Sequence, residues 1–248
     1  RRRISIAVWE LRPAPCSDTR RLPIGLVATA KLKEKKMVRF YFATLAFSAV
    51  LTAGLDVAIA ANPPGDGWRV LFDGKSLDGW EKHGGKAQYR VEDGAIVGNS
   101  VPNTSNTFLC TKDTFSDFEL EFEVNVGPGL NSGVQVRSKI KENDRVYGPQ
   151  VEIARAPGPS GYIYGEGTGQ GWLSQNRTGR DPSKNDQWNH FRVVCKGANI
   201  KTWINGEPVA DLTDEESARE GLIGLQVHGV GAREEPLYVR WRNIRVRE

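Results

Sequence analysis

Three short segments of the sequence each place two large polar side chains on one face of a predicted strand. Side chains two residues apart in a strand share a face, and this rule pairs polar residues within 133–138, 148–153 and 225–229. The six residues are Gln135, Arg137, Gln150, Glu152, Gln226 and His228. Amides beside Arg, Glu and His suit a hydrogen-bonding groove for a hydroxyl-rich ligand. The alternative is a merely solvated face, although such a face is usually richer in Lys, Thr and Ser.

A glycine-rich run from residue 155 to residue 187 shows no clear strand, and a run of that length in a compact domain is usually functional. Tyr162, Tyr164 and Trp172 lie among its glycines. Flat aromatic rings suit stacking on the apolar face of a sugar; the alternative is that they pin the run to the sheet. The run is not a phosphate loop, because neither the following helix nor the P-loop lysine is present.

Cys110 and Cys195 share strand parity with apolar neighbours, so both thiols are expected to face the core. They are either two separate thiols or one disulfide. Neither is expected to be a nucleophile, and the two cysteines and three histidines that follow residue 60 make no zinc pattern. No metal or cofactor is expected in the site, and a structural calcium ion stays open.

The elements that position these residues are predicted to be strands. The segment 117–126 alternates polar and apolar residues without a break, which indicates a half-buried antiparallel strand. Further strands are predicted at 68–72, 89–91, 95–97, 133–140, 147–154, 190–196, 200–204, 222–228 and 237–246.

Turn signals separate the strands. Asp93-Gly94 and Asn205-Gly206 predict type I′ hairpin turns, and a slip of parity predicts a bulge at Asn243. The only helical candidate is a capping box over 213–216. The pattern predicts an all-β, two-sheet antiparallel sandwich of the jelly-roll type with one short helix.

The first 60 residues do not resemble a folded domain. We interpret residues 1–36 as a non-native upstream extension. Residues 37–60 have the basic start, apolar run and small-residue cleavage site of a signal peptide. The alternative, a membrane anchor, is disfavoured because Gly54 and Asp56 interrupt the apolar run. The folded domain is then 61–248, secreted or periplasmic, with no stable membrane anchor. It holds 23 basic and 26 acidic residues, a net charge of −3, so nothing electrostatic favours nucleic acid as a partner.

The order of several motifs resembles the family of 3-keto-disaccharide hydrolase domains. The motifs are FDGKSLDGW (72–80), NSGVQVR (131–137), YGPQVEI (147–153), WN (188–189), WING (203–206), IGLQVHG (223–229) and VRWRNIRV (239–246). The resemblance implies a concanavalin-like lectin or glucanase fold with a concave, sugar-binding sheet face. Many members have Asp where this chain has Val227, a position expected to face the core.

The resemblance also implies a carbohydrate-active hydrolase acting on 3-keto-glycosides or disaccharides. Glu152 and His228 are candidate bases, and Arg137 is the candidate partner of an enolate or carbonyl oxygen. Glu166, in the glycine-rich run, is a candidate second acid. The predicted substrate-binding residues are Gln135, Gln150, Gln226, Tyr164, Glu166 and Trp172. Two alternatives remain: a non-catalytic, lectin-like carbohydrate-binding module, and an ordinary glycosidase, which is disfavoured because no strand carries carboxylates in a tight pattern such as Glu-x-Asp-x-x-Glu.

Overall fold

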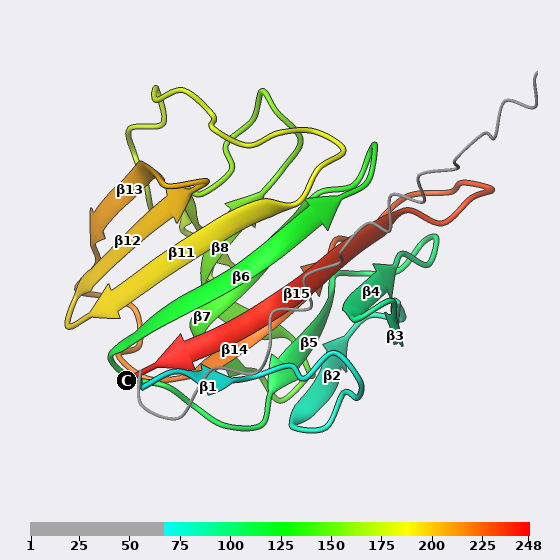
Figure 1. Cartoon of the computed structure of the whole chain (residues 1–248), viewed down its shortest axis with the longest axis horizontal. Coiled ribbons are helices and arrows are strands. Elements are labelled where there is room, and N and C mark those ends of the chain that lie inside the picture. Colours follow the sequence, from blue (N-terminus) through cyan, green and yellow to red (C-terminus); the bar gives the residue numbers. More distant parts are fainter. Residues whose placement is uncertain (1–66) are drawn as a thin grey trace, which may run out of the picture. The chain divides into compact units, whose positions relative to one another are not determined.

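The computed structural model of this chain describes residues 67–248. The predicted upstream extension 1–36 and signal peptide 37–60 lie outside the described residues. The described part is built of two antiparallel β-sheets packed face to face (Figure 1). The predicted all-β sandwich is confirmed. No helix among residues 67–248 is long and apolar enough to cross a membrane.

The first sheet has eight strands in the order β13-β12-β11-β6-β15-β4-β3, with β1 paired to β15. Its strands are β1 (Arg69–Val70), β3 (Gln88–Glu92), β4 (Ala95–Asn99), β6 (Phe118–Val126), β11 (Asn189–Lys196), β12 (Asn199–Ile204), β13 (Glu207–Thr213) and β15 (Tyr238–Arg247). The second sheet has seven strands in the order β10-β9-β8-β7-β14-β5-β2. Its strands are β2 (Trp80–Gly84), β5 (Thr107–Thr111), β7 (Ser132–Ile140), β8 (Val146–Ile153), β9 (Ile163–Glu166), β10 (Gly171–Trp172) and β14 (Leu222–Val227).

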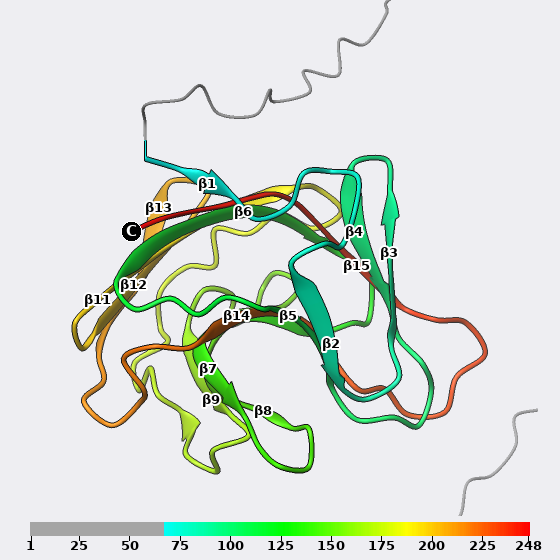
Figure 2. The ribbon, with the colours of Figure 1, turned by 90° about the horizontal axis from the view of Figure 1, so that it is seen from below.

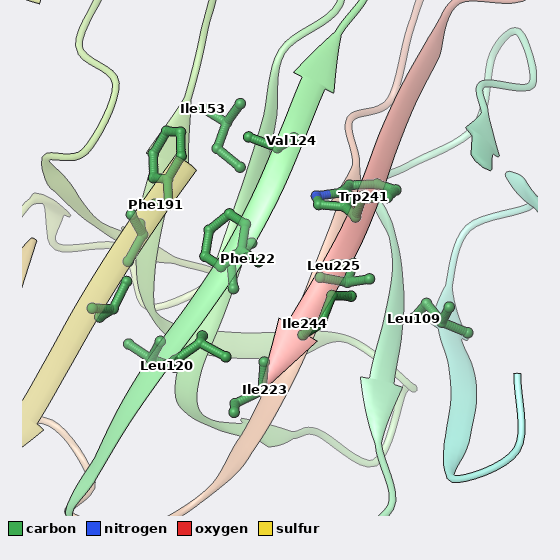
Figure 3. Close-up of a cluster of buried hydrophobic side chains, with 14 of the residues drawn as sticks. Leu109, Leu120, Phe122, Val124, Ile153, Phe191, Ile223, Leu225, Trp241 and Ile244 are labelled. Atoms are coloured by element: carbon green, nitrogen blue, oxygen red, sulfur yellow. The ribbon is translucent and has the colours of Figure 1, made fainter. Parts of the chain in front are cut away.

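The core lies between the sheets and follows the alternation of the strands. In β6 the side chains of Leu120, Phe122 and Val124 are buried, while the intervening glutamates are only partly buried. Figure 3 shows these side chains packed with Phe191 and Trp241 of the same sheet and with residues of the facing sheet. Burial of apolar surface on this scale is the main driving force for the sandwich.

The predicted turns and the predicted bulge are confirmed. Asp93, Gly94, Asn205 and Gly206 all have positive φ, as a type I′ turn requires at both central positions. Asn243 has a φ of 53°, and the register of β15 against β6 shifts between Arg242 and Arg245.

Two sequence predictions about local structure are wrong. The segment 213–216 forms no helix: Thr213 ends β13, and the Asp214 side chain instead accepts hydrogen bonds from the amides of Glu216 and Ser217. The run 155–187 does contain strands, namely β9 and β10, which pair antiparallel with each other. Its glycines hid these strands, because glycine weakens the apolar alternation that identifies a strand.

Both cysteines of the described part are free and buried. Cys195 lies in the main core, where burial raises the pKa of its thiol to about 12. Cys110 does not face that core. It lies on the opposite face of the second sheet, in a small apolar cluster with Phe108, Val146 and Leu222. The prediction of a buried, separate thiol is confirmed for Cys110, but it faces this second cluster, because Leu109 is the β5 residue that joins the main core.

The outer face of the first sheet is covered by an internally paired ladder of charges. Arginines of β15 and β11 form ion pairs with the β6 glutamates Glu119, Glu121 and Glu123. Arg192 and Arg242 also stack on Trp203 and Trp188. Since these charges satisfy one another, the outer face of the second sheet is the better place to look for a ligand site.

Candidate functional site

The outer face of the second sheet is concave. In Figure 2 the sheet curves downward, away from the first sheet, from β14 through β7 to β8 and β9. A pocket of about 180 Å³ opens on this face. Its lining residues are Asn131, Gln150, Glu152, Tyr164, Glu166, Trp172 and His228. A second cavity, of about 10 Å³ beside Val124, is too small for a saccharide.

Cross-strand pairing brings the pocket residues together. Gln150 of β8 is the direct partner of Tyr164 of β9, which in turn is the partner of Trp172 of β10. Glu152 lies two residues along β8 and is the partner of Gly133. A Cβ atom at Gly133 would lie 2.4 Å from the Gln150 side chain, so only glycine leaves room for that amide.

A chain of buried amides ends on the Glu152 carboxylate. The Ser138 hydroxyl donates to Gln135 Oε1 at 2.6 Å, and Gln135 Nε2 donates to Gln150 Oε1 at 2.9 Å. Gln150 Nε2 then donates to Glu152 Oε2 at 3.1 Å, while Asn131 Nδ2 donates to Glu152 Oε1. Every donor in this chain points toward Glu152, so the chain fixes the carboxylate as an acceptor on both oxygens.

The Glu152 carboxyl is held in an unusual electrostatic state. Burial raises its pKa above the ordinary glutamate value, and the hydrogen bonds from Asn131 and Gln150 only partly oppose this rise. The nearby His228 also lowers the pKa, and Glu166 raises it. A carboxylate with a raised pKa beside an open pocket has the properties of a general base.

His228 follows β14 and faces the pocket with one ring nitrogen. Its Nδ1 donates to the carbonyl oxygen of Gly229 at 2.7 Å, which leaves Nε2 to meet a ligand. The Gly229 amide donates to Asn106 Oδ1 at 2.8 Å, and Asn106 Nδ2 lies 3.4 Å from Glu166 Oε1. Asn106 therefore connects the His228 segment with the acidic wall of the pocket.

The predicted aromatic residues have different positions. Tyr164 and Trp172 both line the pocket and contact each other edge to face, with ring centroids 5.2 Å apart. Arg177 stacks on Trp172 at 4.5 Å and holds that ring in place. Tyr162 instead is buried, and its hydroxyl accepts a hydrogen bond from the Gly179 amide, so it pins the segment.

Gln135 and Gln226 lie on the predicted face but beneath the pocket surface. Both are fully buried. Gln135 acts through Gln150, as described above. Gln226 is the cross-strand partner of Gly133, and neither atom of its amide has a hydrogen-bond partner within residues 67–248.

Arg137 does not share the face of the pocket, and that prediction is wrong. Its guanidinium donates to the carbonyl oxygens of Ser116 and Gly197 and to the Asp117 carboxylate, which belong to loops at the ends of first-sheet strands. The reason is a bulge. The register of β7 shifts between Gln135 and Lys139, and Arg137 has a φ of 50°. One extra residue reverses the parity beyond the bulge.

Two residues of the site were not among the predicted site residues: Asn131, which lines the pocket, and Asn106, which does not line it but is hydrogen-bonded to Glu166 and to the Gly229 amide. Asn131 precedes β7 within a motif that carries the family resemblance, so that motif was the available signal. Asn106 precedes β5 and has no comparable signal in the sequence. Among residues 67–248, no group of three or more His, Cys, Asp or Glu side chains is arranged to hold a metal ion. A structural calcium ion stays a prediction.

Comparison with known proteins places this pocket in a carbohydrate-related context. A "3-keto-disaccharide hydrolase" of Bacteroides thetaiotaomicron is 33% identical over 97 residues, which cover 34% of this chain and 33% of the relative. The match thus spans only about a third of that relative's length.

Two solved structures show the same fold. A protein of Parabacteroides distasonis, provisionally assigned as a glycosyl hydrolase, has a TM-score of 0.55 and 20% identity, covering 73% of this chain and 93% of that one. The carbohydrate-binding module CBM66 of Bacillus subtilis has a TM-score of 0.51 and 18% identity, covering 68% and 96%. The family described as the 3-keto-alpha-glucoside-1,2-lyase-like domain matches residues 67–247, and the chain belongs to this carbohydrate-active family.

Proposed function

We propose that this domain cleaves the glycosidic bond of 3-keto-glycosides and that Glu152 is the base that removes the C2 proton. The observation that carries the proposal is the state of the Glu152 carboxylate. It lies at an open pocket, has a raised pKa and is held by donors from Asn131 and Gln150.

The reaction starts from the acidity that a ketone at C3 confers on the proton at C2. The Glu152 carboxylate takes that proton, and the electron pair forms the enolate. The C1–O bond then breaks, a C1=C2 double bond forms, and protonated His228 gives its Nε2 proton to the leaving oxygen. Water adds next: its hydroxyl joins C1, Glu152 returns a proton to C2, and His228 takes the remaining proton. Both groups end in their starting states.

The lining of the pocket supports these roles. His228 is the only one of the seven lining residues that can carry a positive charge, which suits it to give a proton to the leaving oxygen. Trp172 and Tyr164 form an aromatic wall on which a sugar ring can stack. The family description, a 1,2-lyase, fits an elimination across C1 and C2. The name of the Bacteroides relative fits the overall hydrolysis.

A second function is a non-catalytic carbohydrate-binding module. The fold similarity to CBM66 and the aromatic wall favour it. The two functions differ in what Glu152 does, because a binding module needs no base.

The test is an assay of the purified domain on a 3-keto-disaccharide and on its unoxidised parent. We expect turnover of the oxidised sugar alone, lost in Glu152→Gln. Binding of both sugars without turnover of either would favour the binding module. Turnover of the parent alone would favour an ordinary glycosidase. Full activity of Glu152→Gln would show that the base is another residue.

We also propose that the protein is exported, with its mature chain starting near Ala61 or Asn62. The support is the basic, apolar and small-residue pattern of residues 37–60. N-terminal sequencing of protein recovered from the periplasm or the medium tests this. A mature start at Met37 would contradict it.

A further inference from the structure

The turn between β7 and β8 (residues 141–145, the strap) crosses part of the outer face of the second sheet and is tied at both sides. Asp144 Oδ1 is 2.6 Å from His83 Nδ1, and Asp144 Oδ2 accepts from the Gly84 amide at 2.9 Å. Both partners lie on β2, the strand at one edge of the sheet. On the other side, Lys141 Nζ donates to the Gly167 carbonyl in the β9–β10 turn at 2.8 Å.

The part of the sheet beneath the strap is apolar and covered. Ile223 and Leu225 of β14 face the main core, so Leu222 faces outward. It packs with Phe108 and Cys110 of β5 and with Val146, which directly follows the strap. All four side chains are buried, although they lie on the outer face of the sheet.

The strap therefore divides the outer face into two parts. The pocket is open over β8, β9 and β10 and reaches His228 just after β14, whereas the outer faces of β14 and β5 themselves are covered. Arg145 of the strap lies beside the pocket, with its Nη2 3.7 Å from Glu166 Oε1. A groove across all strands of a sheet can hold an internal unit of a long saccharide. A groove blocked at one side can hold only the terminal sugar of a saccharide.

We propose that the strap makes this pocket blind on its β14 side, so that it takes the terminal sugar of a saccharide and rejects an internal one. Asp144 and His83 hold the strap across the face and are specificity-determining residues. The proposal rests on the proposed function for the identity of the sugar, a 3-keto-glycosyl unit.

Two trisaccharides built from the same three sugars test this. One carries the 3-keto group in the terminal unit at the non-reducing end, and the other carries it in the middle unit. The variant replaces residues 141–145 by Asn-Gly, a sequence that favours a two-residue hairpin turn. Ile140 and Val146 are cross-strand partners, so such a turn can close the shortened hairpin. A second variant, Asp144→Ala with His83→Ala, loosens the strap without shortening it. The matched control, Asp113→Ala, breaks an exposed ion pair with Arg69 elsewhere.

We expect the unaltered domain and the control to prefer the terminal keto sugar by roughly tenfold or more in kcat/KM. The shortened variant should bring the two sugars to similar values. If the shortened variant does not fold, the double variant decides instead. Its preference in kcat/KM for the terminal keto sugar should be smaller than that of the unaltered domain, and trypsin should cut it faster after Lys141 and Arg145. Equal kcat/KM of the unaltered domain for both sugars would overturn the proposal, and so would an unchanged preference in the variant that folds.

Failure of the proposed function has a different outcome. Calorimetry of both trisaccharides with Glu152→Gln measures binding without turnover. If no protein turns over either sugar but the binding preference persists and falls in the strap variants, the strap proposal stands and the hydrolase proposal fails. If the unaltered domain turns over both trisaccharides equally, the hydrolase proposal stands and the strap proposal fails.

Discussion

Gln135→Met tests whether the buried amides position Glu152 or merely fill space. The substitution keeps the length of the side chain and removes its amide. Gln150 Oε1 then loses its donor, while the Ser138 hydroxyl keeps the carbonyls of Val136 and Pro149 within 3.4 Å. One buried acceptor is left without a partner.

The expected cost in the free energy of unfolding is about 1–3 kcal/mol, the penalty for one unpaired buried polar group. For a domain of this size, each kcal/mol lowers Tm by roughly 2–4 °C. The fold should survive, because Gln135 is only one of many buried residues. The main effect should be on the pKa of the Glu152 carboxyl rather than on the fold. With the Gln150 amide free to turn, the carboxylate loses a donor that lowers its pKa.

The sign of the pH effect follows from that loss. Glu152 acts as a base only when ionised, so kcat/KM falls as pH drops through its pKa, which lies above the ordinary glutamate value. Gln135→Met should raise this pKa further and move the acid limb of the pH profile upward. Carbon-13 NMR titration of the Glu152 carboxyl measures the same shift without turnover.

Ser100→Ala is the matched control. Ser100 directly follows β4 of the first sheet, outside the pocket; it is buried, and its hydroxyl accepts from the Leu237 amide at 2.9 Å. It should lose comparable stability with no change in the acid limb. If Gln135→Met left the acid limb in place, or if Ser100→Ala moved it equally, the amide chain would have no positioning role.

The other predictions concern the pocket and the thiols. Glu152→Gln should lower kcat by roughly 10²–10⁴-fold, the usual range for a lost general base, with circular dichroism unchanged. His228→Ala should lower kcat on a 3-keto-disaccharide, and less so on a substrate with an acidic leaving group such as nitrophenol, which needs no proton; equal losses on both would contradict its role as the acid. Trp172→Ala should raise KM more than it lowers kcat, as steady-state kinetics would show. Cys110 and Cys195 should resist a thiol reagent in the native domain and react with it after denaturation; absence of both thiols from the denatured protein would indicate a disulfide instead.

The sequence was informative wherever a local rule acts without competition. The turns at Asn205-Gly206 and Asp93-Gly94 require positive φ, and both have it. The strand β6 follows its alternation throughout. The same alternation placed Gln150 and Glu152 on the pocket face, because β8 runs without a bulge from Gln150 to Ile153. The three central residues of β5, Phe108, Leu109 and Cys110, are all apolar, so parity could not tell the core face from the strap face. There Cys110 was misplaced.

The bulge in β7 explains why both Arg137 and the strap were beyond local prediction. A bulge is recognised by pairing with neighbouring strands, and β7 shifts register against both β8 and β14. The extra residue turns Arg137 toward Ser116, Asp117 and Gly197, where it ties the second sheet to loops of the first. It is also the place where a bulged strand bends most. Beyond it, the hairpin leaves the line of the sheet and carries Asp144 to His83. The feature that removes the predicted arginine from the site is thus the one that brings the strap across it.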